Sequence, residues 1–287
     1  MMLRRAPGPR LSLFVSDLWV SSLVPTPGAP REHVLPTGGM HLVFRLSGAP
    51  LRIYDADDAP EGREIGRAIV GGARSCHYVR DVSVATRSVG AQLLPGAAEV
   101  LIGESADRLA ERHTNLAELW GDVAVDEAMT QLAECRTDAA VLDCFEAILV
   151  ARLRRLRRIH PAVAAALVNF SASADIATAV DESGFSHRHF NSLFRQAVGI
   201  TPKLYCRITR FRRAVEIAAS DPSASWADLA HACGYSDQPH FVRDFRAFSG
   251  LSPTEYRKSS GPFAMHVPRR ADVDSVKSVQ DRDDRGA

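Results

Sequence analysis

Gly234-Tyr235-Ser236-Asp237-Gln238 opens the stretch that decides the fold of this 287-residue chain, and it continues as Pro239-His240-Phe241-Val242-Arg243-Asp244-Phe245-Arg246, then Gly250-Leu251-Ser252-Pro253 and Tyr256. About fifty residues earlier the same pattern occurs as Gly184-Phe185-Ser186-His187-Arg188-His189-Phe190-Asn191-Ser192-Leu193-Phe194-Arg195, then Gly199-Ile200-Thr201-Pro202 and Tyr205. Internal repetition indicates one structural unit used twice.

Each copy predicts two helices joined by a glycine turn. A first helix is expected at about 175–183 and again at 226–233, where Ser225 is placed to cap it. Gly184 and Gly234 then end these helices, because a left-handed residue at that position favours glycine. A second helix follows, starting at Ser186 or Ser236. Helix, glycine turn and helix define a helix-turn-helix unit, whose second helix can lie in the major groove of DNA.

The second helix of each copy has one apolar and one polar face. Phenylalanines four residues apart, Phe190 with Phe194 and Phe241 with Phe245, face inward. Gly199 or Gly250 ends the helix, and Thr-Pro or Ser-Pro opens the next one. The side chains that can face outward are His187, Arg188, Asn191 and Arg195 in the first copy, and Asp237, Gln238, His240, Arg243 and Arg246 in the second.

Residues 202–219, between the copies, predict a strongly amphipathic helix. Its apolar positions step by four and three residues, and its other face is basic, with Lys203, Arg207, Arg210 and Arg213. Eighteen residues span about 27 Å of helix. Two recognition helices on one face of a duplex should lie about 34 Å apart, and a connecting helix of this length is compatible with that spacing.

Residues from about 160 to 258 resemble the DNA-binding domain of the AraC/XylS transcriptional regulators. The motif that carries the resemblance is Gly234 to Gln238 with Phe241, Arg243, Phe245 and the closing Gly250-x-x-Pro253-x-x-Tyr256. Residues 35–44 and Pro95-Gly96 also resemble the β-rich sensor region of some members. The resemblance implies base contacts by Arg188 and its neighbours in the first copy, and by Gln238, His240 and Arg243 in the second.

Chemistry assigns the outward side chains to two kinds of contact. Arginine pairs with guanine, and asparagine or glutamine with adenine, so we expect base contacts from Arg188, Asn191, Gln238, His240 and Arg243. We expect phosphate contacts from Arg195, Lys203, Arg207 and Arg246. The alternative for each is a solvated face. Asp237 is interpreted as a helix cap, since an anion is favourable at a helix N-terminus.

The first half of the chain differs in pattern and charge. Short apolar segments at 41–46, 51–54 and 65–70, separated by Gly and Pro, predict a compact β-rich domain. Residues 1–150 carry a net charge of −6 and residues 151–260 one of +7, which suggests two units with different partners. The fold class is therefore α+β: a β-rich, barrel-like N-terminal domain with following helices, and an all-α C-terminal domain of two helix-turn-helix units joined by a linker helix.

Four segments follow from these patterns. They are a β-rich sensor or dimerisation domain at 1–136, a connecting helix at 137–159, the double helix-turn-helix domain at 160–260 and a disordered tail at 261–287. The connecting helix, from about 138 to 158, has an apolar stripe ending in an arginine-rich segment. We expect this stripe to mediate self-association, with packing inside its own domain as the alternative.

Several other classes of function lack support. Five cysteines without a CxxC pair predict neither disulfides nor a thiolate zinc site, and the histidines lack metal-ligand spacing, so we expect no metal and no cofactor. No phosphate loop or nucleophile elbow occurs, so we expect no enzymatic activity. Two alternatives stay open: a β-barrel enzyme with an appended DNA-binding domain, and a DNA-repair methyl acceptor.

The sequence thus predicts a sequence-specific DNA-binding transcriptional regulator. We expect double-stranded DNA as its partner, with a small-molecule effector, RNA polymerase for an activator, and a second copy of the chain as further candidates. No apolar run approaches the length that spans a bilayer, and we expect no membrane partner and a cytoplasmic location.

Overall fold

Two antiparallel sheets form the N-terminal domain of the computed structural model, which describes residues 2–153, 159–172, 175–259, 261 and 263–269. The first sheet has the strand order β1-β2-β9-β4-β7-β10, with bounds Met2–Arg5, Val15–Leu23, Thr86–Leu93, Met40–Ser47, Ala68–Gly71 and His113–Asn115. The second has the order β11-β3-β8-β5-β6, with bounds His266–Arg269, Arg31–Val34, Tyr78–Asp81, Leu51–Tyr54 and Arg63–Gly66. The β-rich prediction for this half is confirmed.

Alternating side chains place the core on one face of the first sheet. In β4, Met40, Leu42 and Phe44 are buried, as the period of two in a strand requires. The predicted single segment at 65–70 is two strands in different sheets. The chain turns between them at Gly66, whose φ of 136° is a conformation that a side chain disfavours, so one apolar run serves both sheets.

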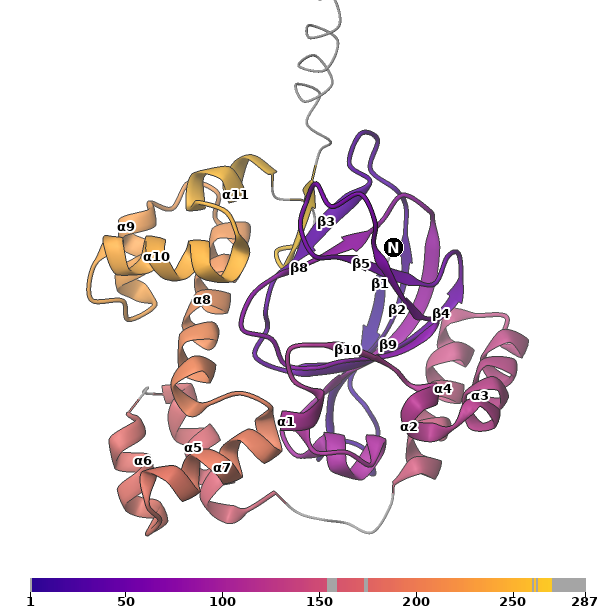
Figure 1. Cartoon of the computed structure of the whole chain (residues 1–287), viewed down its shortest axis with the longest axis horizontal. Helices are drawn as coiled ribbons and strands as arrows, with labels where there is room; N and C mark the ends of the chain where they lie inside the picture. The colour runs from indigo at the N-terminus through magenta and orange to yellow at the C-terminus, as the bar shows by residue number, and fades with distance from the viewer. Residues whose placement is uncertain (1, 154–158, 173–174, 260, 262, 270–287) are drawn as a thin grey trace, which may run out of the picture.

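Helices cover the outer side of the first sheet, at the right of Figure 1. They are α2 (Ala117–Trp120), α3 (Asp122–Glu134) and α4 (Asp138–Arg152), with a π-helical turn (Ala98–Ile102) and α1 (Ala106–Leu109) nearby. The stripe expected to mediate self-association lies on α4, where Val141, Leu142, Phe145 and Leu149 are buried. Phe145 packs edge-on against Phe44 of β4, so the described part of the stripe belongs to the domain's own core. Its arginine-rich end, 154–158, lies outside the described residues.

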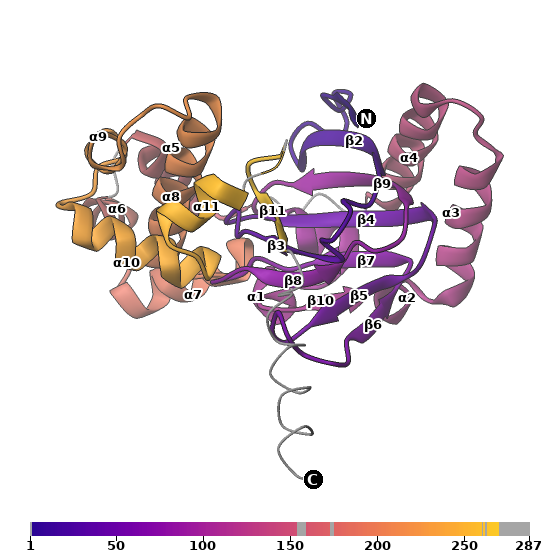
Figure 2. The ribbon, with the colours of Figure 1, turned by 90° about the horizontal axis from the view of Figure 1, so that it is seen from above.

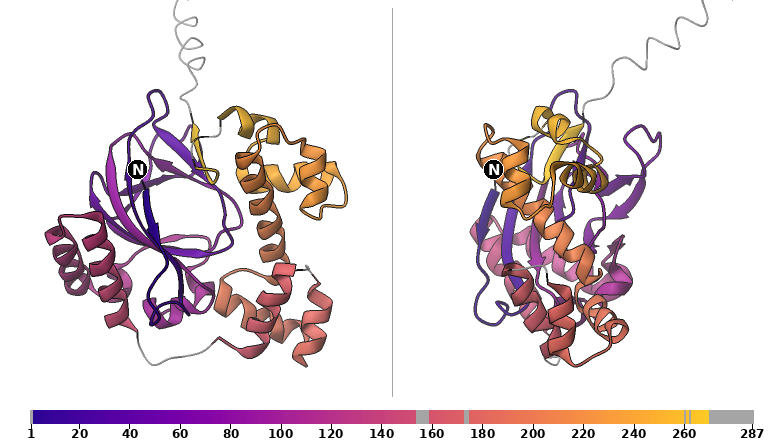
Figure 3. Two further views of the ribbon diagram at one scale, coloured as in Figure 1. Left: turned by 180° about the vertical axis from the view of Figure 1, so that it is seen from behind. Right: turned by 90° about the vertical axis from the view of Figure 1, so that its left-hand side faces the viewer.

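Seven helices form the C-terminal domain within the described residues. They are α5 (Pro161–Ala172), α6 (Ile176–Ser183), α7 (His187–Val198), α8 (Pro202–Ser220), α9 (Trp226–Ala232), α10 (Gln238–Ser249) and α11 (Pro253–Ser259). The helix-turn-helix units are α6–α7 and α9–α10, and Figure 1 shows them at opposite ends of α8. The right-hand view of Figure 3 looks onto this helical side of the molecule. The predicted all-α domain is confirmed.

Local sequence signals set the helix boundaries as predicted. Ser186 accepts a hydrogen bond from the His189 amide and Ser225 from that of Asp228, each capping a helix. The second recognition helix begins one residue later than Ser236, because Asp237 is its cap and accepts from the His240 amide at 2.6 Å. Gly184 and Gly234 both have a positive φ, which lets the chain turn sharply into the next helix.

The predicted disordered tail needs a correction. Residues 266–269 form β11, which adds to the edge of the second sheet beside β3. Figure 2 shows β11 between that sheet and the helical domain. Val267 is fully buried, and this apolar contact together with backbone pairing orders a segment whose composition is polar. Residues 270–287, the rest of the predicted tail, lie outside the described residues.

Candidate functional site

The recognition helices α7 and α10 present the side chains that the sequence placed outward. Arg188, Gln238 and Arg243 are exposed, and Asn191 and His240 are half-buried. The structure therefore groups the predicted base contacts on the free faces of two helices, Arg188 and Asn191 on α7 and the other three on α10. These faces belong to units at opposite ends of α8.

The inner faces of the same helices hold the aromatic core. Phe190, Phe194, Phe241 and Phe245 are all fully buried. Trp226 of α9 stacks on Phe241 with ring centroids 5.9 Å apart, so the first helix of the second unit is held against its recognition helix. Phenylalanines at a spacing of four are thus sufficient to orient each recognition helix, with its polar residues toward solvent.

The residues predicted to contact phosphate divide into two groups. Arg195, Lys203 and Arg246 are exposed with no ion pair to described residues, and so are free to meet a polyanion. Arg207 of α8 is engaged instead, because its Nη2 donates to Oδ1 of Asp244 at 2.6 Å. The Asp244 carboxylate is 3% exposed, and the ion pair ties α8 to α10 inside the second unit.

Sequence reasoning missed this ion pair. Asp244 lies within the quoted motif, between exposed Arg243 and buried Phe245. The available signal was the presence of an acidic residue in a recognition helix. An acidic side chain facing DNA phosphates would be repelled, so a buried partner is the physical alternative. His240 also lies 3.9 Å from the same carboxylate and 3.3 Å from the Ser236 hydroxyl.

Asp237 serves as the predicted cap of α10. The hydrogen bond from the His240 amide is the largest cause that lowers the pKa of Asp237 below its usual value. The carboxylate is therefore charged at neutral pH and favourably placed at the helix N-terminus. This role leaves Gln238 and Arg243 as the exposed candidates on the same helix.

A cavity of about 440 Å³ lies between the two sheets, which is within the range of small-molecule sites. Trp19, Val43, Leu51 and Ile69 supply part of its apolar wall. Its polar lining includes His41, Arg45, Arg74, Tyr78, Arg80 and Gln92 together with Glu32. The cavity is also lined by residues that follow the helical domain in the sequence, namely Phe263, Met265, His266 and Pro268. Strand patterns did not predict the cavity, since it depends on how the sheets face each other.

The cavity wall is positively charged overall. Glu32 is the acidic residue of the lining, and it already accepts hydrogen bonds from Arg80 at 2.5 Å and His266 at 2.9 Å. Burial alone would raise the pKa of Glu32, but the charge of Arg80 and the hydrogen bonds from both partners outweigh it and lower the pKa to about 2. Burial, followed by the charge of Arg80, lowers the pKa of His41 to about 4. His41 is therefore neutral at physiological pH, and the arginines keep their excess of charge.

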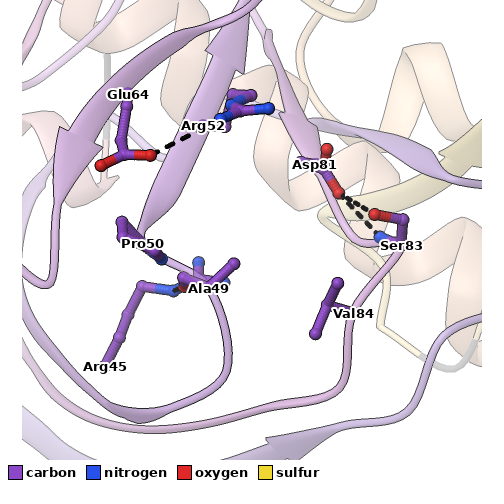
Figure 4. Close-up of a pocket in the computed structure, with 8 residues that line it drawn as sticks. All are labelled: Arg45, Ala49, Pro50, Arg52, Glu64, Asp81, Ser83 and Val84. Atoms are coloured by element: carbon purple, nitrogen blue, oxygen red, sulfur yellow. Dashed lines mark hydrogen bonds and ion pairs between the residues drawn. The ribbon is translucent and has the colours of Figure 1, made fainter.

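A second, smaller pocket opens at the β5 side of the domain (Figure 4). Its volume is about 150 Å³, below the usual range for a ligand site. Arg52 and Glu64 form an ion pair across it at 3.5 Å, and the Asp81 carboxylate accepts from the Ser83 amide and hydroxyl. Its charged groups are thus partnered locally.

Metal and membrane features are absent from the part of the chain that the structure describes. No three His, Cys, Asp or Glu side chains there are grouped so that they could hold a metal ion. His33 and His77 stack on each other, with ring centroids 4.1 Å apart. No helix among the described residues has the length and apolarity to cross a bilayer.

Comparison with family models matches both halves of the chain. Residues 179–259 match a model described as a helix-turn-helix domain. Residues 3–115 match one described as a domain of unknown function (DUF6597). The geometry and the first match together define the C-terminal part as a double helix-turn-helix domain. This match agrees with the resemblance of the C-terminal domain to the DNA-binding domains of the AraC/XylS regulators.

Two curated relatives each match less than a third of this chain. The probable transcriptional regulator LumQ of Photobacterium leiognathi is 35% identical over 68 residues, which are 24% of this chain and 27% of LumQ. The HTH-type transcriptional activator RhaS of Escherichia coli is 31% identical over 83 residues, 29% of this chain and 30% of RhaS. The match thus spans less than a third of either relative.

Solved structures give a broader but more distant likeness. ToxT from Vibrio cholerae is 8% identical with a TM-score of 0.47, and the match covers 90% of this chain and 98% of ToxT. The C-terminal domain of AraT, a response regulator from Geobacillus stearothermophilus, is 22% identical with a TM-score of 0.34, covering 36% of this chain and 89% of that domain.

Proposed function

We propose that this protein is a sequence-specific DNA-binding transcriptional regulator. The observation that carries the proposal is the repeated unit, with two recognition helices whose polar faces are free at opposite ends of one rigid helix. Both recognition helices would enter successive major grooves on one side of the duplex. Base contacts are assigned to Arg188, Asn191, Gln238, His240 and Arg243, and phosphate contacts to Arg195, Lys203 and Arg246.

Arg243→Ala tests the second recognition helix. The guanidinium is exposed on α10, and a bidentate pair with a base contributes about 1–3 kcal/mol of discrimination. The variant should bind its selected duplex about ten- to a hundredfold more weakly and should accept more bases at one position. Duplex selection from a random library with the full chain, followed by gel-shift titration, measures both effects.

Arg52→Ala is the matched control for that experiment. Arg52 is a half-exposed arginine of the N-terminal domain, paired with Glu64. It should bind like the unmodified protein. Unchanged affinity and base preference in Arg243→Ala would show that this side chain does not contact bases.

Arg246→Ala tests the phosphate assignment. Each phosphate contact makes the negative slope of log K against log salt concentration steeper by about 0.9. Loss of the Arg246 contact should therefore make this slope shallower by about that amount. Affinity should weaken for every sequence alike, because a phosphate contact carries no base information directly. Gel shifts at several salt concentrations measure the slope. An altered base preference would contradict the assignment.

The N-terminal domain is proposed to sense a small-molecule effector in the 440 Å³ cavity. Its volume and its combination of apolar walls with polar and charged groups are compatible with a ligand site. A dimer would use a surface other than the α4 stripe, since the described part of that stripe is buried. We propose that the protein acts in the cytoplasm, without enzymatic activity, and contacts RNA polymerase if it is an activator.

A further inference from the structure

Arg74, an arginine of the cavity lining, has no ion pair with another described residue. Arg74 lies 3.5 Å from Nδ1 of His113 and over the Tyr78 ring at 5.3 Å. Its Nε is buried without a hydrogen-bond partner among the described residues, and so is Nε2 of His113. A buried donor without an acceptor costs free energy, so this corner of the wall favours a group that accepts hydrogen bonds, and the guanidinium charge makes an anionic acceptor the more favourable one.

The two other arginines of the lining already have hydrogen-bond partners. Arg80 is satisfied by Glu32, and Arg45 donates to the carbonyl oxygen of Ala49 at 2.8 Å. Burial, then repulsion from Arg80, lowers the pKa of Arg45 to about 10, which leaves it charged at neutral pH. The lining therefore presents three guanidinium groups against one carboxylate, Glu32. This excess selects an anion, whereas Trp19 and the aliphatic wall select an apolar body.

Three consecutive residues of β3 connect the cavity to the helical domain. Glu32 and Val34 line the cavity, and His33, which points to the other face of the strand, donates from Nδ1 to the Ser249 carbonyl at 3.0 Å. Because Ser249 carries a carbonyl oxygen, His33 is the donor there. The amide of His77 donates to the Phe248 carbonyl at 2.8 Å. The C-terminal end of recognition helix α10 is thus held on the second sheet.

The strand β11 is attached to the same three residues. Its pairing with β3 sets Val267 opposite His33 and His266 opposite Val34. His266 contacts Glu32 at 2.9 Å, and the Tyr256 hydroxyl of α11 donates to the Ala264 carbonyl at 2.9 Å. The segment 263–268 is therefore one wall of the cavity and also the covalent continuation of the second helix-turn-helix unit.

We propose that the cavity binds a small organic anion with an apolar body, and that the C-terminal strand β11 is part of this binding site. Binding and the docking of β11 on β3 then stabilise each other, since a ligand favours the state to which it binds more tightly. Through β11 and His33, an occupied cavity holds the second recognition unit against the N-terminal domain. The regulatory part of this inference rests on the proposed function.

A matched ligand panel tests the anion. The probes are octanoate and phenylacetate against octanamide and phenylacetamide, added to the full chain in a thermal-shift experiment. We expect the carboxylates to raise the melting temperature more than the amides of the same shape, because a ligand of the folded state stabilises it. In Arg74→Met the Kd of the carboxylates, measured by calorimetry, should rise about tenfold. Arg52→Met, outside the cavity, should bind them normally.

Two truncations test the role of β11. A chain ending at Ser259 lacks the strand, and a chain ending at residue 271 keeps it. We expect carboxylate binding to weaken severalfold in the first and to persist in the second. Val267→Ala, a milder change at a fully buried position, should give an intermediate loss. Hydrogen exchange of the peptide containing 264–269 in the full chain should slow when the carboxylate is added.

The outcomes separate this inference from the proposed function. Equal stabilisation by carboxylates and amides, or none by either, overturns the anion site. Equal carboxylate binding by both truncations, with no change in exchange at 264–269, overturns the role of β11. Both results leave duplex binding by the full chain intact. Absence of duplex binding in the Arg243 experiment would overturn the proposed function without touching the ligand result.

Discussion

Phe211→Ala is expected to lower the free energy of unfolding by about 3–5 kcal/mol. Phe211 is fully buried in α8, with its ring centroid 5.2 Å from those of both Phe245 and Phe248. Truncation removes these contacts and leaves a cavity where α8 meets α10, which the rigid helices cannot fill. Urea denaturation followed by circular dichroism measures the loss, and duplex binding should fall with it.

Arg213→Ala is the control for this experiment. Arg213 is on the same helix and exposed, so its removal should change the free energy of unfolding by no more than about 0.5 kcal/mol. A loss below about 1 kcal/mol in Phe211→Ala would mean that the α8–α10 contact does not hold the second unit together.

Arg207→Ala is expected to cost about 3 kcal/mol of folding free energy. The change leaves the carboxylate of Asp244, which is 3% exposed, without its ion-pair partner in the protein interior. Uncompensated burial of a charge is among the most destabilising effects of a single substitution. Thermal and urea denaturation of the full chain give the magnitude.

A double variant separates the ion pair from a phosphate contact. Arg207→Leu with Asp244→Leu removes both charges, and replacement of a buried pair by apolar residues is often neutral, so stability should largely recover. Lys203→Ala, exposed on the same helix, should leave stability unchanged. If Arg207→Ala instead folds normally and loses affinity for every duplex alike, Arg207 contacts phosphate and the ion pair is incidental.

Short-range signals account for the helical domain. Helix ends depend on residues only a few positions apart, such as the Ser225 cap and the turn at Gly234, and both occur as the sequence predicted. The inward phenylalanines and outward polar residues follow from the helical period alone. These features made the recognition helices and their candidate base contacts predictable.

Long-range features were not predictable in the same way. The local pattern did not indicate that residues 65–70 divide between two sheets. It also did not relate β11 to β3, or Arg207 to Asp244, which lie far apart in the sequence. A polar strand such as β11 carries a weak hydrophobic signal, and it is ordered because a sheet edge offers it partners.

The sequence by itself determined that this chain has two helix-turn-helix units on a connecting helix, because their helices depend on local capping, turns and periodicity. Only the tertiary structure decided which cations are committed to buried partners, how the sheets enclose a cationic cavity, and that the chain returns to close its wall. Charge pairing and enclosure depend on side chains that are brought together by packing, and no spacing along the chain encodes that proximity.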